Sequence, residues 1–315
     1  MSEAYRILIT APYFLPVLER FRDRLEAAGC ELVPYPVTER AGEEELLTRI
    51  AGIDGVICGD DAFTRRVVEA TDRLKVIAKW GTGIDSIDTG ACAERGIAVL
   101  NTPDAFSLPV ADTVLGYALI FARRLLETDR AMQAGEWSKQ SAAALSEWTF
   151  GIVGVGNIGR QVARRAATFG PRLLGTDIVE IDAGLRAETG LEAVELTQLL
   201  ETSDVVSLNC DLNPTSRHLV RTATLELMKP GAVLINTARG AVVKESDLVA
   251  ALDSGRLGGA ALDVFEVEPL PADSPLRGRP NVLLGPHNAN SSPRAWEAVH
   301  ENTVTNLLQG LAGAE

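Results

Sequence analysis

The chain has 315 residues, and 46% of them are hydrophobic, which is enough for well-packed cores and, by length, for about two domains. Its formal net charge of −13 argues against nucleic acid or an anionic membrane as the main partner. No apolar run reaches the length of a bilayer span, Met1–Arg6 lack a signal-peptide pattern, and the scattered cysteines are typical of reduced buried thiols, so we expect a cytoplasmic protein.

The first third of the chain alternates short apolar runs with amphipathic helical segments such as Leu15–Ala28 and Glu43–Ile50. This rhythm predicts a parallel, doubly wound α/β sheet. The expected strands are Ile7–Thr10, Leu32–Tyr35, Gly55–Cys58, Val76–Ala78 and Ala98–Leu100.

A long helical stretch, Ser107–Gln133, separates this series from a second one, and a small-residue arm, Ala134–Ser146, follows it. The second series has the six strands expected of two mononucleotide-binding halves, and a final helix is expected over Arg294–Leu311. These strands are Phe150–Val153, Arg172–Gly175, Val205–Leu208, Val233–Asn236, Ala260–Leu262 and Val282–Leu284.

Gly154, Gly156 and Gly159 form a G-x-G-x-x-G run between an apolar strand and a helix. Glycines at this spacing allow a tight turn, close approach of a pyrophosphate and close packing of helix on strand, so the run predicts a dinucleotide site. Asp177 ends the next strand, where its carboxylate can accept hydrogen bonds from the hydroxyls of the adenosine ribose. Because residues 178–180 contain no cation for a 2′-phosphate, NAD is expected rather than NADP.

Three further polar segments follow predicted strands of the second series: Asn236–Gly240, Asp263–Pro269 and Gly285–Asn288. Ligands of open α/β sheets bind at the carboxyl ends of the strands, so these segments are candidates for the site.

Together with Gly81–Asp88 and Asn101–Pro103, these motifs resemble the D-2-hydroxyacid dehydrogenase family, which includes D-3-phosphoglycerate dehydrogenases and glyoxylate and hydroxypyruvate reductases. The resemblance implies two doubly wound parallel-sheet domains. Residues 1–101 plus 287–315 would form a flavodoxin-like substrate domain, and residues 102–286 a Rossmann NAD-binding domain, with the substrate held between the two. It also implies a homodimer through residues 105–148, although that apolar helix could instead be internal core.

The resemblance assigns a catalytic set. His287 would exchange a proton with the substrate hydroxyl, and Glu268 would fix its tautomer and stabilise the imidazolium. Arg239 would hold the carboxylate of the small anionic 2-hydroxy or 2-keto acid. Glu266 lies close to Glu268, and only the motif separates the two. His218 and His300 receive no catalytic role.

The resemblance also implies cofactor and substrate contacts. Asp263 would contact the nicotinamide carboxamide, and the N–H groups of the loop around Thr82 and Gly83 would complete the carboxylate site. Lys79 could read a distal phosphate or carboxylate of the substrate, or could be a surface lysine. The expected NAD contacts are Gly154, Gly156, Asn157, Ile158, Gly159, Asp177, Cys210, Ala238 and Asp263, and no metal is expected.

The leading hypothesis is therefore an NAD-dependent D-2-hydroxyacid dehydrogenase, D-3-phosphoglycerate dehydrogenase-like but of a short form without a regulatory domain. A glyoxylate or hydroxypyruvate reductase is the alternative, and a nucleotide-sensing, corepressor-like binding protein is the rival from another class. Departures from the family pattern at Phe106, Asp211 and Asn288–Asn290 bear on specificity rather than on reaction class.

Overall fold

The structure is a computed structural model that describes residues 4–313, so Met1–Glu3, part of the segment examined for a signal peptide, lie outside the described residues. The chain divides into two compact units. Unit 1 comprises Met1–Phe106 and Ser292–Glu315, and unit 2 comprises Ser107–Ser291. Within residues 4–313 no helix is long and apolar enough to cross a membrane.

Both boundaries between the units differ from the expected ones at 101/102 and 286/287. Thr102 donates its backbone N–H to the Gly81 carbonyl at 2.9 Å, and the Phe106 ring lies 5.9 Å from Trp80, so the segment after residue 101 stays with unit 1. At the other end, the backbone N–H groups of Asn288 and Ala289 bind the Asp263 carboxylate, which keeps residues 287–291 in unit 2.

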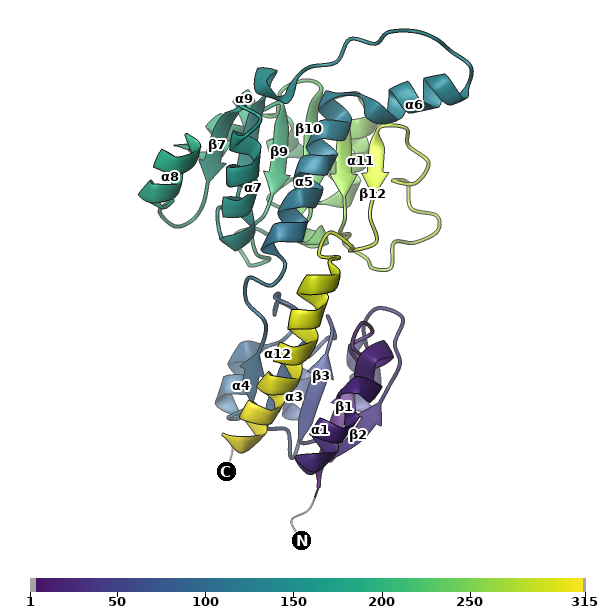
Figure 1. Ribbon diagram of the computed structural model, residues 1–315, viewed down its shortest axis with the longest axis vertical. Helices are drawn as coiled ribbons and strands as arrows, with labels where there is room; N and C mark the ends of the chain where they lie inside the picture. Colours follow the sequence, from purple (N-terminus) through teal and green to yellow (C-terminus); the bar gives the residue numbers. More distant parts are fainter. Residues whose placement is uncertain (1–3, 314–315) are drawn as a thin grey trace. The chain divides into compact units, whose positions relative to one another are not determined.

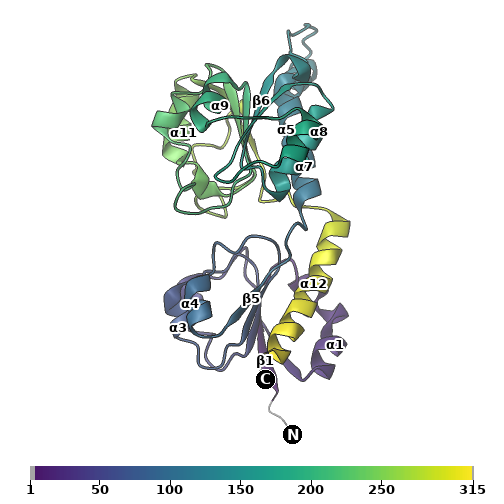
Figure 2. The same ribbon diagram turned by 90° about the vertical axis from the view of Figure 1, so that its left-hand side faces the viewer.

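Unit 1 is built on a five-stranded parallel sheet in the order β2-β1-β3-β4-β5, the flavodoxin-like order that was expected. Figure 2 shows α1 and α12 on one face of this sheet and α3 and α4 on the other. Its strands are β1 Tyr5–Ile9, β2 Cys30–Pro34, β3 Gly55–Cys58, β4 Val76–Lys79 and β5 Ala98–Leu100. Its helices are η1 Leu15–Arg20, α1 Arg22–Ala27, α2 Glu43–Leu47, α3 Arg65–Glu69, α4 Thr89–Glu94 and α12 Pro293–Ala312.

Helix α12 returns the chain's end to unit 1. The Ser292 hydroxyl caps it by accepting the Ala295 N–H, and Pro293 occupies the first turn. Gly310 faces β4 so closely that a Cβ there would collide with Val76, which fixes the close packing of this helix on the sheet.

Unit 2 is built on a seven-stranded parallel sheet in the order β12-β11-β10-β9-β6-β7-β8, the doubly wound Rossmann order with one added strand. Helices α5, α7 and α8 lie on one face and α9 and α11 on the other (Figures 1 and 2). Its strands are β6 Thr149–Val153, β7 Arg172–Thr176, β8 Glu192–Ala193, β9 Val205–Leu208, β10 Ala232–Asn236, β11 Leu257–Leu262 and β12 Val282–Leu284. Its helices are α5 Ser107–Ala122, α6 Leu125–Gln133, η2 Leu145–Glu147, α7 Asn157–Ala167, α8 Ala183–Thr189, α9 Leu196–Thr202, α10 Thr222–Leu225, η3 Gly240–Val242 and α11 Glu245–Asp253.

The prediction of six strands in this half was wrong by one edge strand. Strand β8 consists only of Glu192 and Ala193, and both are exposed. Since a two-residue exposed strand has no apolar run, the pattern that revealed the six buried strands could not reveal this one.

The single helix expected over residues 107–133 is two helices. Arg124 adopts the left-handed conformation with φ 51°, which ends α5 and starts α6 in a new direction. The buried face of α5 stops at Ala122, and α6 buries none of its residues. Similarly, the helix expected over residues 15–28 is divided at Phe21 into η1 and α1.

Candidate active site

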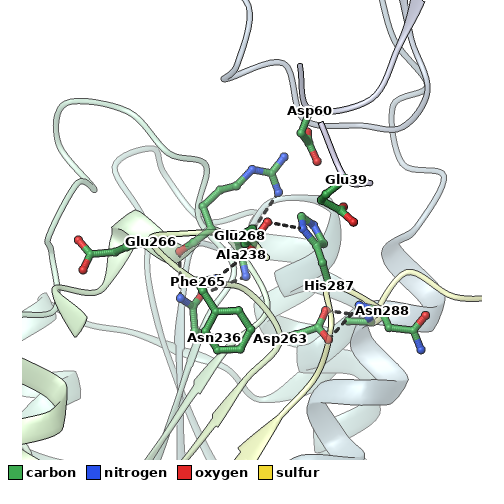
Figure 3. A network of polar contacts seen from close by, with 12 residues as sticks. Glu39, Asp60, Asn236, Ala238, Asp263, Phe265, Glu266, Glu268, His287 and Asn288 are labelled. Atoms are coloured by element: carbon green, nitrogen blue, oxygen red, sulfur yellow. Dashed lines mark hydrogen bonds and ion pairs between the residues drawn. The ribbon is translucent and has the colours of Figure 1, made fainter. Parts of the chain in front are cut away.

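The three polar segments singled out in the second half follow β10, β11 and β12, which are neighbours in the sheet of unit 2. Because the strands are parallel, their carboxyl ends meet at one edge and bring the segments together. Figure 3 shows Asn236, Asp263, Glu268 and His287 gathered there.

His287 and Glu268 form a direct pair, with His287 Nδ1 3.1 Å from Glu268 Oε2. The other carboxylate oxygen of Glu268 accepts the Phe265 N–H at 2.8 Å, which fixes the acid in place. The side chains are only 20% and 15% exposed, respectively. His287 has φ 54°, a left-handed conformation that is uncommon for a non-glycine residue and aims the ring from a sharp turn after β12.

The neighbouring acid, Glu266, is engaged elsewhere. Its Oε1 lies 2.7 Å from His218 Nε2, and its Oε2 accepts the Glu245 N–H at 3.0 Å. Figure 3 shows Glu266 pointing away from His287. The structure thus brings Glu268, and not Glu266, to His287, and it pairs His218 with a carboxylate that sequence reasoning did not assign to it.

Asp263 holds the turn that carries His287. Its two carboxylate oxygens accept the N–H groups of Asn288 at 3.0 Å and Ala289 at 2.7 Å, and its carbonyl accepts the His287 N–H at 2.8 Å. Burial raises the pKa of Asp263 above its ordinary value, and the N–H bonds from Ala289 and Asn288 oppose that rise. The expected nicotinamide contact of Asp263 stays a prediction. Each carboxylate oxygen already accepts one backbone N–H and can accept a second hydrogen bond.

Arg239 stands on a rigid loop after β10. Asn236, which is buried, donates its amide to the Arg239 carbonyl at 2.9 Å and accepts the Ala238 N–H at 3.1 Å. A Cβ at Gly240 would collide with the backbone of Phe265, so only glycine allows the two loops to approach this closely. Asn236 is therefore a positioning residue that lay inside a motif but was not singled out.

The glycine-rich turn has the geometry that a diphosphate needs. Gly154 has φ 84°, and a Cβ there would collide with the Cys210 backbone after β9. Gly156, by contrast, faces open space, and no side chain caps the start of α7, which begins at Asn157 and Ile158. Asp177 anchors the turn, since its Oδ2 accepts the Val155 N–H at 2.6 Å.

The residues present therefore fit a bound dinucleotide. The space beside Gly156 and the uncapped N–H groups of α7 suit a pyrophosphate. On the same loop as Arg239, the buried Thr237 hydroxyl has no hydrogen-bond partner among the described residues, which makes it a candidate partner for a ligand atom. Sequence reasoning did not single out this candidate.

Asp177 sets a prediction on cofactor choice. We expect Asp177→Asn to raise the ratio of kcat/KM with NADPH to that with NADH at least ~10-fold, because it removes a charge that repels the 2′-phosphate. The exposed acid Glu180 provides the control, since Glu180→Gln removes the same charge from the same loop. An equal rise in both variants would contradict a specific role for Asp177.

The four cysteines give a second prediction. Burial raises the pKa of Cys210 to about 11 from its ordinary 9.0, and it also raises the pKa of each of the other three cysteines. Since only the thiolate attacks, Cys210 should react with an aromatic disulfide reagent at about pH 8 roughly 100-fold more slowly than an exposed thiol, and faster as the pH rises. The same labelling of the Cys210→Ser variant shows how much of the wild-type signal comes from Cys210. Cys210 itself is only partly buried, so rapid labelling of the folded wild type at Cys210 would contradict the raised pKa rather than its exposure.

The substrate contacts expected in the first half all lie in unit 1, at the carboxyl end of β4. Thr82 donates its hydroxyl to the Thr102 carbonyl at 3.0 Å, and Gly83 follows it in the loop. The surface alternative for Lys79 was wrong, because this residue ends β4 and is only 4% exposed. Its ammonium lies 3.1 Å from Asp60 Oδ1 and donates to the Trp80 carbonyl.

His300 is a structural residue. It is buried on α12, and its Nδ1 accepts the Trp80 indole N–H at 2.9 Å. Burial lowers the pKa of His300, which favours the neutral ring that this bond requires.

A doubly wound sheet with a glycine-rich turn after its first strand and a paired histidine and glutamate at its carboxyl edge is typical of a dinucleotide-dependent oxidoreductase. The family model described as D-isomer specific 2-hydroxyacid dehydrogenase, NAD binding domain, matches residues 115–289, more than half of the chain. The chain belongs to this family, and it is an NAD-dependent oxidoreductase of 2-hydroxy acids.

Two curated relatives and one solved structure illustrate the similarity. The chain is 37% identical over 275 residues to D-3-phosphoglycerate dehydrogenase of Methanocaldococcus jannaschii, covering 86% of this chain but only 52% of that protein. It is 38% identical over 277 residues to glyoxylate reductase of Thermofilum pendens, and the match covers 86% of this chain and 82% of that protein. The structure of Aquifex aeolicus D-lactate dehydrogenase, complexed with NAD and lactic acid, matches with TM-score 0.86 and 26% identity over 98% of each chain.

Proposed function

We propose that the chain interconverts a D-2-hydroxy acid and its 2-keto acid, with His287 as the acid–base group. The observation that supports this most is the His287–Glu268 pair at 3.1 Å beside the Arg239 loop. When bound, NAD would accept the hydride that leaves C2 of the hydroxy acid, and NADH would return a hydride to C2 of the keto acid. His287 takes the proton of the substrate hydroxyl during oxidation and returns it during reduction. Glu268 orients the ring and stabilises its protonated form.

Arg239 is proposed to hold the substrate carboxylate, because a guanidinium binds the two oxygens with matching geometry. Thr82 and Gly83 remain the proposed carboxylate contacts contributed by unit 1. For the substrate, 3-phosphoglycerate and its keto acid are one candidate and glyoxylate or hydroxypyruvate the other, in line with the names of the two curated relatives.

The test is NADH oxidation against a panel of 2-keto acids: glyoxylate, hydroxypyruvate, pyruvate, 2-ketoglutarate and 3-phosphohydroxypyruvate. Turnover of at least one of them with kcat/KM of ~10⁴ M⁻¹s⁻¹ or more is expected of a working enzyme. Tight NADH binding without turnover of any of them, together with NAD-dependent binding of a peptide, would replace the enzyme by the binding protein considered above.

Glu268 and Glu266 make a matched pair for a mutational prediction. We expect Glu268→Gln to lower kcat on the order of 10²–10³-fold, because the ring loses the carboxylate that holds its tautomer and its charge. Glu266→Gln, which leaves the His287 partner intact, should lower kcat less than ~10-fold. Equal losses in the two variants would contradict the assignment of Glu268.

We also propose that the chain acts as a cytoplasmic homodimer. Three of the exposed large apolar side chains lie on α6 and the arm after it: Leu125, Met132 and Trp137, the last of which is 87% exposed. Exposed large apolar side chains on one helix and the arm that follows it favour contact with a second copy. Light scattering should give twice the chain mass, and the double variant Leu125→Glu, Trp137→Ser should shift the population towards monomer. A monomeric wild type at micromolar concentration would contradict the dimer.

A further inference from the structure

The carboxyl edge of the unit 1 sheet carries an ion pair between a buried lysine and a half-buried aspartate at the proposed substrate loop. Asp60 follows β3, and Lys79 ends the adjacent β4. Lys79 Nζ lies 3.1 Å from Asp60 Oδ1, and the lysine side chain is 5% exposed against 29% for the aspartate. The same ammonium donates to the Trp80 carbonyl at 3.1 Å, so its hydrogen-bonding capacity is largely used.

A second carboxylate shares this cation. Asp61 is fully buried and accepts hydrogen bonds from the Thr10 hydroxyl and from the backbone N–H groups of Ala41 and Gly59. Burial raises the pKa of Asp61, and those bonds and the charge of Lys79 oppose that rise. One lysine therefore faces two aspartates, and these two carboxylates offset its charge.

Aromatic side chains surround Trp80, the residue that follows Lys79. The Trp80 ring lies 5.4 Å from Tyr13, 5.9 Å from Phe106 and 5.7 Å from Trp296. Gly81, which opens the Thr82–Gly83 loop, has φ 122°, and a Cβ there would lie 3.6 Å both from Lys79 Nζ and from the Phe106 ring. The loop thus starts between a neutralised ammonium and an aromatic side chain.

We propose that Asp60 makes the enzyme select 2-keto acids whose side chain carries no charge, and that it rejects a phosphate or a second carboxylate. The inference rests on the proposed function, in which this loop contacts the substrate. A distal anion would have to separate Lys79 from Asp60 or lie beside the Asp60 carboxylate. Like charges about 6 Å apart at an effective dielectric of about 20 give a discrimination on the order of 100-fold.

Hydroxypyruvate and 3-phosphohydroxypyruvate test the proposal, because they share a carbon skeleton and differ by the phosphate. The kcat/KM of the wild type should be at least ~100-fold higher for hydroxypyruvate than for 3-phosphohydroxypyruvate. Asp60→Asn should lower this ratio at least ~10-fold, because Lys79 can then bind the phosphate. The double variant Asp60→Asn, Lys79→Met should return the ratio to its wild-type value. Comparing two substrates within each variant removes any general loss of activity. Glu69→Gln, an exposed acid of the same unit, should leave the ratio unchanged.

A wild-type preference for the phosphorylated acid would overturn the proposal and leave the proposed function standing. An unchanged ratio in folded Asp60→Asn, as judged by its thermal unfolding, would overturn it in the same way. The ratio measured for the wild type tests the proposal by itself, even if a variant folds poorly. No turnover of any 2-keto acid in the panel would instead overturn the proposed function, and this inference with it.

Discussion

Replacing His287 by asparagine is expected to lower kcat on the order of 10³-fold or more, in both directions of the reaction. Asparagine tolerates the left-handed backbone of this position, where φ is 54°, but cannot exchange a proton. Because the substitution leaves the glycine-rich turn untouched, the dissociation constant of NADH, measured by fluorescence, should change less than ~3-fold.

The chain offers an unusually close control for this variant. His218 also has a left-handed backbone, with φ 52°, and also pairs with a glutamate, Glu266, at 2.7 Å. His218→Asn therefore makes the same chemical change in the same local geometry, away from the proposed acid–base position. It should cost less than ~10-fold in kcat. A loss as large as that of His287→Asn, or a His287→Asn enzyme that keeps its rate, would contradict the assignment of the acid–base residue.

Replacing Arg239 by alanine is the second large effect. We expect kcat/KM for every 2-keto acid to fall on the order of 10³-fold, mainly through KM, because the substrate carboxylate loses its charged partner. Arg239→Lys should recover only a small part, since an ammonium does not reproduce the planar fork of the guanidinium.

Arg217→Ala serves as the control for charge, because Arg217 is exposed on the neighbouring loop of the same unit. It should change KM for the keto acid less than ~2-fold. Steady-state kinetics with varied keto acid at saturating NADH measure both variants. An Arg239→Ala enzyme whose KM is normal would show that this cation does not bind the substrate.

The core of the fold could be predicted from the sequence because buried parallel strands are nearly continuous apolar runs, as β3, β9 and β10 are. The glycine-rich turn could be predicted because its chemistry leaves little choice of residue. Gly154 needs a positive φ and packs against the Cys210 backbone, and Gly156 must leave space open.

What could not be predicted depends on tertiary neighbours. The break at Arg124 is a left-handed arginine, and arginine, unlike glycine or asparagine, does not indicate that conformation in a sequence. The choice between Glu266 and Glu268 depends on which residues each side chain contacts, and the burial of Lys79 depends on contacts with Asp60, which follows the neighbouring strand β3. Asn236 and Thr237 lay within a recognised motif, but their roles follow from hydrogen bonds that are made, or left unmade, only in the folded chain.

The most direct test of the account uses NADH deuterated at the position that is transferred, with the best 2-keto acid of the panel other than glyoxylate, whose product glycolate has no stereocentre at C2. The product, analysed by mass spectrometry and chiral chromatography, should be the D-2-hydroxy acid with one deuterium on C2, and His287→Asn should form it far more slowly. A product without deuterium, a product of the L configuration, or bound NADH that transfers nothing to any keto acid would contradict the account.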